Sequence, residues 1–197
     1  LTTFLLTLLP LVAYADGPRP EAPRPRTETW YEFTFYGNKV GYLHAVDEPT
    51  TLDGQPAIHS KRRSVLEVRR ASQTIRMESD TDAWSDLAGR PLRFTHVRTE
   101  GGAVRRLEGQ KRGETFVVKV DVGGTLTEKV HPYTADLRLS ASLDAHLKRD
   151  LVVGKKSQGL ALLEEEGEVR PYTVKVLQKE GELFVVQSEV AGIVSLE

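Results

Sequence analysis

The sequence predicts a mainly β fold, an antiparallel meander that forms a curved sheet or half-barrel, with one α-helix near residues 140–151. Three observations support this expectation. Apolar and polar residues alternate with a period of two in many short segments, as in residues 73–80. Glycine, aspartate and proline separate these segments, which is typical of tight turns. The apolar spacing changes to four only around residues 139–151, which favours a helix there.

The first predicted hairpin is aromatic and tight. Residues 29–36 alternate and are rich in aromatic side chains, and Gly37-Asn38 suits a two-residue turn into the next strand. Gly41 within that strand indicates a β-bulge or the close approach of a neighbouring backbone. The central meander follows over residues 57–109, and its outer faces are expected to be rich in arginine.

Residues 82–91 are predicted to form a turn, because Asp, Gly and Pro occur together there. Its expected structural residues are Trp84, Asp86 and Gly89. We expect the Trp84 ring to be partly buried as a plug and Asp86 to accept hydrogen bonds from turn backbone. Gly89 is expected to take a positive φ. Residues 109–113, which begin and end with glycine, are predicted to be another turn.

The predicted helix carries a leucine at every fourth position: Leu139, Leu143, Leu147 and Leu151. Ser140 or Ser142 can cap its start, and Gly154 can end it. A leucine stripe of this kind is a core face rather than a cofactor site, and we expect it to pack on the concave or open side of the sheet. Further short strands are predicted after Gly154.

Three regions are expected along the chain: a signal peptide (1–15), a Pro-rich linker (16–28) and an antiparallel β domain (29–197). The apolar start followed by Ala13-Tyr14-Ala15 is typical of a cleaved secretory signal, with an uncleaved helix as the alternative. The protein is therefore expected to be extracytoplasmic, periplasmic or secreted, and to meet a membrane only through the transient signal peptide. The last strand starts at Ile193 and is cut short, so we expect the domain to be truncated at its C-terminus.

The composition excludes several classes of function. There are 27 Lys and Arg against 28 Asp and Glu, so the chain lacks the basic excess of a nucleic-acid-binding protein. The absence of cysteine excludes disulfides, a thiol nucleophile, Cys-ligated zinc and a lipoprotein anchor within this sequence. No cofactor is expected. Pairs such as Arg62-Arg63 lie near acidic residues and indicate solvated strand faces rather than an anion-binding patch.

The residues that could carry chemistry do not form a recognisable catalytic or metal-binding pattern. Five histidines are present, namely His44, His59, His96, His131 and His146. None of them has the spacing of a helical metal site, and those at strand positions, such as His44 and His96, are interpreted as satisfied, half-buried residues. Asp82 and Asp86 could form a calcium loop or a carboxylate pair, but turn chemistry explains them better. The acidic run 164–166 is interpreted as solvated. We therefore expect this chain not to be an enzyme.

Several short motifs resemble the β-rich N-terminal region of bacterial secreted transglutaminase-like proteins. Residues 30–32 and 37–44 resemble its opening, and residues 84–92 resemble its W-x-D-x-x-G turn. Residues 147–155 resemble its helix and following glycine, and residues 190–193 resemble the start of a second such turn. The resemblance implies a Cys-His-Asp catalytic domain downstream. None of that activity is carried over to residues of this chain.

Two functions are expected from these motifs and from the composition. The first is a non-catalytic extracytoplasmic module that accompanies a downstream transglutaminase-like domain in the same chain and positions it or binds its protein substrate. The alternative is a stand-alone periplasmic carrier that holds a lipid or other apolar ligand on the curved sheet, with the leucine helix as a lid. An independent hydrolase is the third and least favoured class.

Overall fold

The computed structural model describes residues 25–35, 37–70, 73–147, 151–181, 183–190 and 193–196. The predicted signal peptide and most of the predicted linker lie outside the described residues. Within them, the fold class expected from the sequence is confirmed: the chain is mainly β, with an antiparallel meander in a curved, open sheet and one short helix. No helix in the described part of the chain is long and apolar enough to span a membrane.

The larger sheet is a meander in which each strand pairs antiparallel with the next one along the chain. Its strands are β1 (Thr27–Phe35), β2 (Asn38–Leu52), β3 (Gln55–Arg70), β4 (Gln73–Asp86), β5 (Pro91–Glu100), β6 (Ala103–Arg112), β7 (Thr115–Val122) and β8 (Thr125–Pro132). The predicted close approach at Gly41 is confirmed. The pairing of β1 and β2 shifts register after Phe33, and a Cβ at Gly41 would lie 2.1 Å from the carbonyl oxygen of Val65.

The smaller sheet has the strand order β13-β12-β11-β10-β9. Its elements are β9 (Leu137–Leu139), α1 (Ser140–Leu147), β10 (Lys156–Leu163), β11 (Glu168–Glu180), β12 (Leu183–Val190) and β13 (Ile193–Leu196). The sequence did not predict β9, which pairs parallel with β10 while every other described pair is antiparallel. A parallel pair needs a crossover, and α1 lies in that connection.

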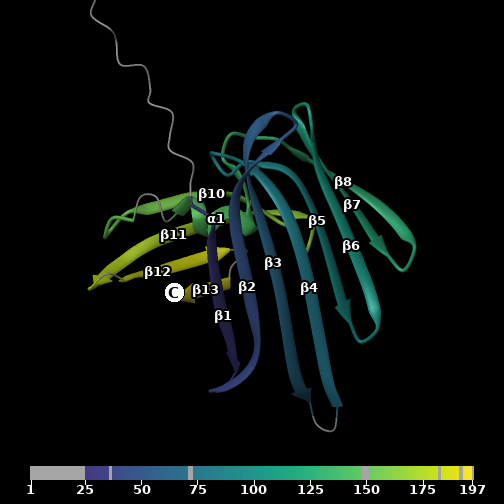
Figure 1. Cartoon of the computed structure of the whole chain (residues 1–197), viewed down its shortest axis with the longest axis horizontal. Helices are drawn as coiled ribbons and strands as arrows, with labels where there is room; N and C mark the ends of the chain where they lie inside the picture. Colours follow the sequence, from purple (N-terminus) through teal and green to yellow (C-terminus); the bar gives the residue numbers. More distant parts are fainter. Residues whose placement is uncertain are drawn as a thin grey trace, which may run out of the picture.

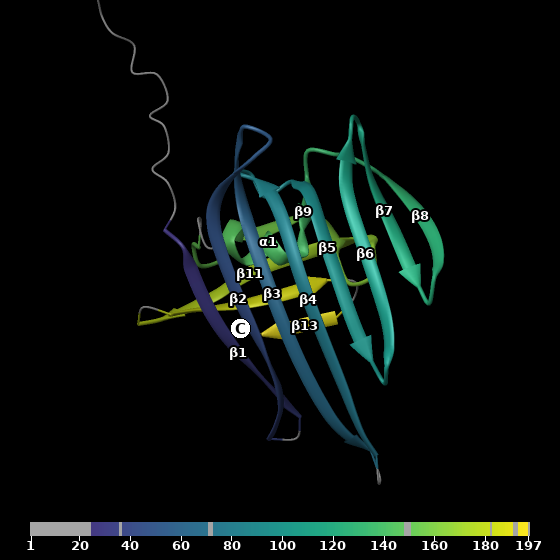
Figure 2. The same ribbon diagram turned by 45° about the vertical axis from the view of Figure 1, so that its right-hand side comes forward.

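The two sheets form two layers. Figure 1 shows the smaller sheet and α1 behind the first strands of the larger sheet, and in Figure 2 strands β3 and β4 cross in front of β12 and β13. The larger sheet curves around this second layer at β6–β8. The main apolar cluster lies between the layers and consists of residues at most 5% exposed: Ala83, Phe94, Leu107, Phe116, Val118, Val120, Leu137, Leu139 and Leu162. This cluster holds the layers together at β4–β7.

Helix α1 is shorter than the sequence predicted. It ends at Leu147, and Leu151 lies outside regular structure; residues 148–150 and the Leu147 side chain are outside the described part. Leu139 belongs to β9, because it pairs with Leu162 of β10. Leu143 is the part of the predicted stripe that is buried on the helix, and it packs against a second cluster on the smaller sheet rather than on the meander.

Two predicted turns are wrong in their extent. Strand β4 continues through Asp86, because Thr81, Ala83 and Ser85 keep alternating into the interior, so the turn is confined to residues 87–90. Gly109 lies inside β6, where the missing side chain leaves room for the stacked rings of Phe94 and Phe116.

We predict that Gly109→Ala destabilises the fold by about 1–3 kcal/mol or more, as overpacking of a well-filled core does. The added Cβ would lie 2.1 Å from Cε1 of Phe94 and 2.6 Å from Cε1 of Phe116, and both rings are fully buried. Chemical denaturation measures the change. The control is Gln110→Ala at the exposed neighbouring position, which should stay within roughly 0.5 kcal/mol of the parent. Equal midpoints for the two variants would contradict this packing.

Candidate functional site

A partly open cavity of about 280 Å³ lies between the inner face of the larger sheet and the chain around α1. Its lining comes from five strands, the start of α1 and the turn after β10: Phe33, Leu43, Arg62, Ser64, Ser79, Thr81, His96, Ser140, Ala141, Glu164 and Glu165. Most of these side chains are polar, although they occupy the inner phase of the strands, where a sheet packed on another layer normally presents apolar residues.

Strand register brings the polar side chains of β3, β4 and β5 together. Ser64 pairs with Ser79, and one step along the same face Thr81 pairs with His96. The hydroxyl oxygens of Ser64 and Ser79 are 2.7 Å apart, and the Thr81 hydroxyl is 2.8 Å from Nδ1 of His96. The inner face therefore carries a hydrogen-bonded polar row. We call Ser64, Ser79, Thr81 and His96 the polar row.

Arg62 joins the larger sheet to the helix. Its guanidinium lies 3.0 Å from the carboxylate of Asp47 on β2 and also donates to the carbonyl of Ala141 in α1. Asp47 in turn accepts a hydrogen bond of 2.5 Å from Ser60. Arg62 and Asp47 are largely buried, with side chains 12% and 16% exposed. The expectation that Arg62 lies on a solvated face is wrong, because its position on β3 points inward; Arg63, one residue on, points outward.

Glu164 is buried at the start of α1. Its carboxyl accepts hydrogen bonds from the Ser140 hydroxyl and, at 3.1 Å, from the backbone N–H of Ala141. Burial raises the pKa of Glu164, while these hydrogen bonds and the nearby Arg62 charge oppose the rise. The acidic run 164–166 was expected to be solvated. Glu164 departs from that expectation because the tight turn between β10 and β11 directs it toward α1.

His96 is only 3% exposed, and its Nε2 has no hydrogen-bond partner among the described residues. The expectation of a satisfied strand histidine is therefore wrong for His96. Burial lowers its pKa to about 4, and the positive charges of Arg105 and Arg98 add to the effect. The imidazole is thus neutral at neutral pH. A buried polar atom without a protein partner is uncommon in native structures.

Beyond the polar row, the same inner face becomes apolar. Leu66 pairs with Met77, and Val68 pairs with Ile75, two and four residues from the serine pair toward the β3–β4 hairpin. All four side chains are half-buried, and we call them the apolar strip. Phe33 and Leu43 line the cavity beside it. The site therefore has a polar end and an apolar end.

The residues predicted to form a structural turn do not line this cavity. Asp86 Oδ1 accepts hydrogen bonds of 2.9 Å from the N–H groups of Ala88 and Arg90, and Gly89 has a φ of +82°. Trp84 lies on the outer face of β4 and is half-buried there, so it does not plug the interior. Its ring stacks on His59 at 4.3 Å, and the guanidinium of Arg93 lies 4.4 Å from its centroid.

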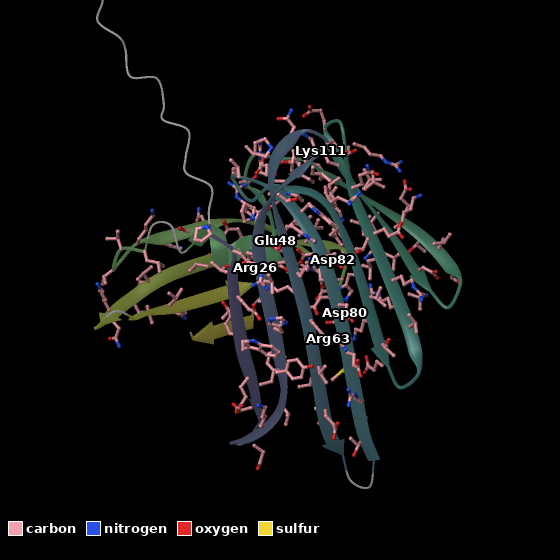
Figure 3. All side chains as sticks on the ribbon, in the orientation of Figure 1. Arg26, Glu48, Arg63, Asp80, Asp82 and Lys111 are labelled. Carbon is pink, nitrogen blue, oxygen red and sulfur yellow. The ribbon has the colours of Figure 1, made fainter. Side chains whose placement is uncertain are left out.

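Asp82 and Asp86 do not share a ligand. Asp82 lies 3.0 Å from Nε2 of His59, whereas Asp86 pairs with Arg90 at 2.7 Å. Figure 3 shows Asp82 with Arg63 and Asp80 on the face of β3 and β4 that is turned away from the smaller sheet. Among the described residues, no group of three or more His, Cys, Asp or Glu side chains could hold a metal ion.

Comparisons with known proteins bear on the fold alone. A scan against models of protein families and a search of curated proteins gave no match. A crystal structure of a β-barrel-like protein of the domain of unknown function DUF1849 from Brucella abortus is similar, with a TM-score of 0.52 and 14% sequence identity. The match covers 77% of this chain and 71% of that chain. The resemblance to transglutaminase-like proteins is not tested by these comparisons and stays a prediction.

We predict that Gly89→Val destabilises the protein more than Arg90→Ala. A left-handed backbone costs an L-residue about 1–2 kcal/mol, and more when the residue is β-branched, as valine is. Arg90 loses an ion pair whose arginine side chain is 42% exposed, which is typically worth about 0–1 kcal/mol. Thermal melts of the two variants test the order. A Gly89→Val variant as stable as the parent would show that the backbone at this turn is not held as described.

His96 should make the stability depend on pH. Its pKa is about 4 in the folded state against 6.5 for an unperturbed histidine, so between these values only the unfolded chain binds the proton. Stability should therefore be full above pH 6.5 and decrease as the pH falls toward 4, by at most roughly 3 kcal/mol. His96→Gln lacks this contribution, so its stability should decrease less over the same range. Parallel curves for the parent and the variant, from urea titrations at several pH values, would contradict a neutral buried imidazole.

Proposed function

We propose that this chain is an extracytoplasmic, non-catalytic module that binds an amphipathic ligand between its two sheets. One observation carries the proposal: a cavity with a polar lining lies next to the apolar strip, on the same inner face of the sheet. A ligand with one polar end and one hydrocarbon chain matches this order. The extracytoplasmic location rests on the predicted signal peptide.

The size of the cavity supports a ligand whose polar head lies in the cavity while most of its hydrocarbon chain lies outside it. Its volume of about 280 Å³ is at the lower end of the range of small-molecule sites, which is roughly 300–1,000 Å³. That space suits a polar head and the first part of a chain, not a whole lipid. The remaining methylene groups would lie along the apolar strip, where each contributes about 0.8 kcal/mol on burial.

This proposal is compatible with both functions expected from the sequence. A binding module can present a substrate to a downstream transglutaminase-like domain, or it can act alone as a carrier. Helix α1 does not need to act as a lid for the carrier, because its first residues already form part of the cavity wall. Whether the downstream reading frame encodes a catalytic Cys and His distinguishes the two.

The proposal is tested by filling the cavity. We predict that a lauroyl amphiphile binds the parent protein, and that Ser79→Phe lowers its affinity by about tenfold or more, because a ring at this position occupies the space of the head. Asp80→Phe is the matched control, since Asp80 is the next residue of β4 and points outward. Isothermal titration below the micelle concentration measures binding, and melting temperatures confirm that both variants fold.

Two results would contradict the proposal. One is that no lauroyl amphiphile binds the parent protein, whatever its head group. The other is that Ser79→Phe and Asp80→Phe bind it equally well, which would locate binding outside the cavity.

A further inference from the structure

We propose that the turn of residues 152–155, which precedes β10, docks on the surface of an anionic lipid bilayer. Val152 and Val153 enter the interface, and the lysines beside them contact lipid phosphates. This surface is separate from the cavity and does not depend on the ligand proposed for it. Three features support the proposal: an apolar pair on a fixed turn, a cross-strand pair of lysines and the place of the turn at the edge of the molecule.

The turn is held in place by backbone hydrogen bonds. The N–H of Lys155 donates to the carbonyl of Val152 at 2.9 Å, which closes the turn. Two more bonds join the turn to β11: the N–H of Gly154 donates to the carbonyl of Val176 at 2.9 Å, and the N–H of Val176 donates to the carbonyl of Lys155 at 3.0 Å. Gly154 has a φ of +85°, which favours glycine. The turn is therefore a fixed extension of the smaller sheet.

Two adjacent valines on this turn face solvent. Val152 is 62% exposed and Val153 is 52% exposed. Turns are usually built from Gly, Pro, Asn, Asp and Ser, each for a backbone reason that valine does not share. Single exposed apolar side chains are normal on a protein surface, but here two neighbours form one small apolar surface. The fold alone gives no reason for two valines at this place.

The surroundings of the turn are basic. Lys156 and Lys175 lie directly opposite each other in the β10–β11 pair, and both are exposed. Like charges in this arrangement destabilise an antiparallel sheet, and neither lysine forms an ion pair with another described residue. Residues 151–156 and 175–180 together contain four lysines and one acidic residue, whereas the whole chain has a net charge of −1. This local excess of positive charge favours an anionic partner.

An anionic bilayer matches both parts of the surface. Binding at a lipid interface combines the burial of apolar side chains with the attraction of lysines to anionic lipids. A soluble anion would pair with the lysines but leave the valines in water. In Figures 1 and 2 the end of β11, against which the turn lies, projects beyond the β1 edge of the larger sheet, so a flat surface can approach it. Two valines bury little area, so binding should be reversible and should need both parts.

The first test measures binding of the ligand-free protein to phosphatidylcholine vesicles, with and without about one third phosphatidylglycerol, by sedimentation. We expect binding to the anionic vesicles at low salt, at least about tenfold weaker binding to the neutral vesicles, and loss of binding at high salt. Lys156→Gln with Lys175→Gln should weaken binding about tenfold or more, since each lysine near an anionic surface contributes about fivefold. The matched control removes two exposed charges from β6 and β7: Arg112→Gln with Lys119→Gln should change binding by about twofold or less.

The second test shows whether the turn itself enters the bilayer. The chain contains no cysteine, so Val153→Cys and Gln110→Cys each create a single labelling site. An environment-sensitive dye at position 153 should brighten and shift to the blue on anionic vesicles, whereas the same dye at the exposed position 110 on β6 should not change.

Three results would overturn the proposal. One is that neither kind of vesicle binds the parent protein. Another is that the double lysine variant binds as tightly as its control. The third is that the dye at position 153 does not respond on vesicles that bind the protein, which would reduce the turn to a charged patch. None of these results bears on ligand binding in the cavity, which is measured without vesicles.

Discussion

The structure depends on an apolar contact between the two sheets that lies toward one side of the larger sheet, at β4–β7. Phe94 and Phe116 stack across the bare backbone of Gly109 and bury their rings against the leucines of β9 and β10. This contact fixes the smaller sheet over β4–β7, because the buried apolar side chains of the larger sheet's main cluster, from Ala83 to Val120, come from those strands. Toward the β1 edge of the larger sheet, the inner face is covered by α1 and the turn after β10, and a cavity remains between them and the strands. The cavity exists because the main apolar cluster fills only part of the space between the two sheets.

Arg62 maintains the geometry of the open part. A buried ion pair contributes little net stability, since desolvation offsets much of the attraction, but loss of one partner is strongly destabilising. Arg62 contacts Asp47 on β2 and Ala141 in α1, so it holds the helix at a set distance from the sheet while its charge is neutralised. The same link neutralises the charge of the guanidinium in the cavity wall. The contacts of Arg62 therefore support a role in setting the distance between α1 and the sheet rather than in net stabilisation.

The sequence predicted the meander, because a period of two is a local signal, but it could not predict the partners of each face. Glu164 looks like the other acids of its run until the turn after β10 directs it inward. Ser79 and His96 likewise look like ordinary strand residues, because the sequence does not show what their face of the sheet packs against. One signal was present: the inner face of β3 is apolar at Ile58, polar from Ser60 to Ser64 and apolar again at Leu66 and Val68. Tracking that phase through paired strands would have indicated the site.

The order of side chains along β3 and β4 gives the site a direction. The polar row lies beside the start of α1, with Thr81 and His96 buried and Ser64 and Ser79 half-buried, and the apolar strip continues toward the β3–β4 hairpin. Under the proposed function, a ligand that placed its hydrocarbon chain against the polar row would leave hydrogen-bonding groups unpaired, so desolvation disfavours the reversed pose. A buried polar atom that lacks a protein partner, such as Nε2 of His96, lowers the stability of the fold.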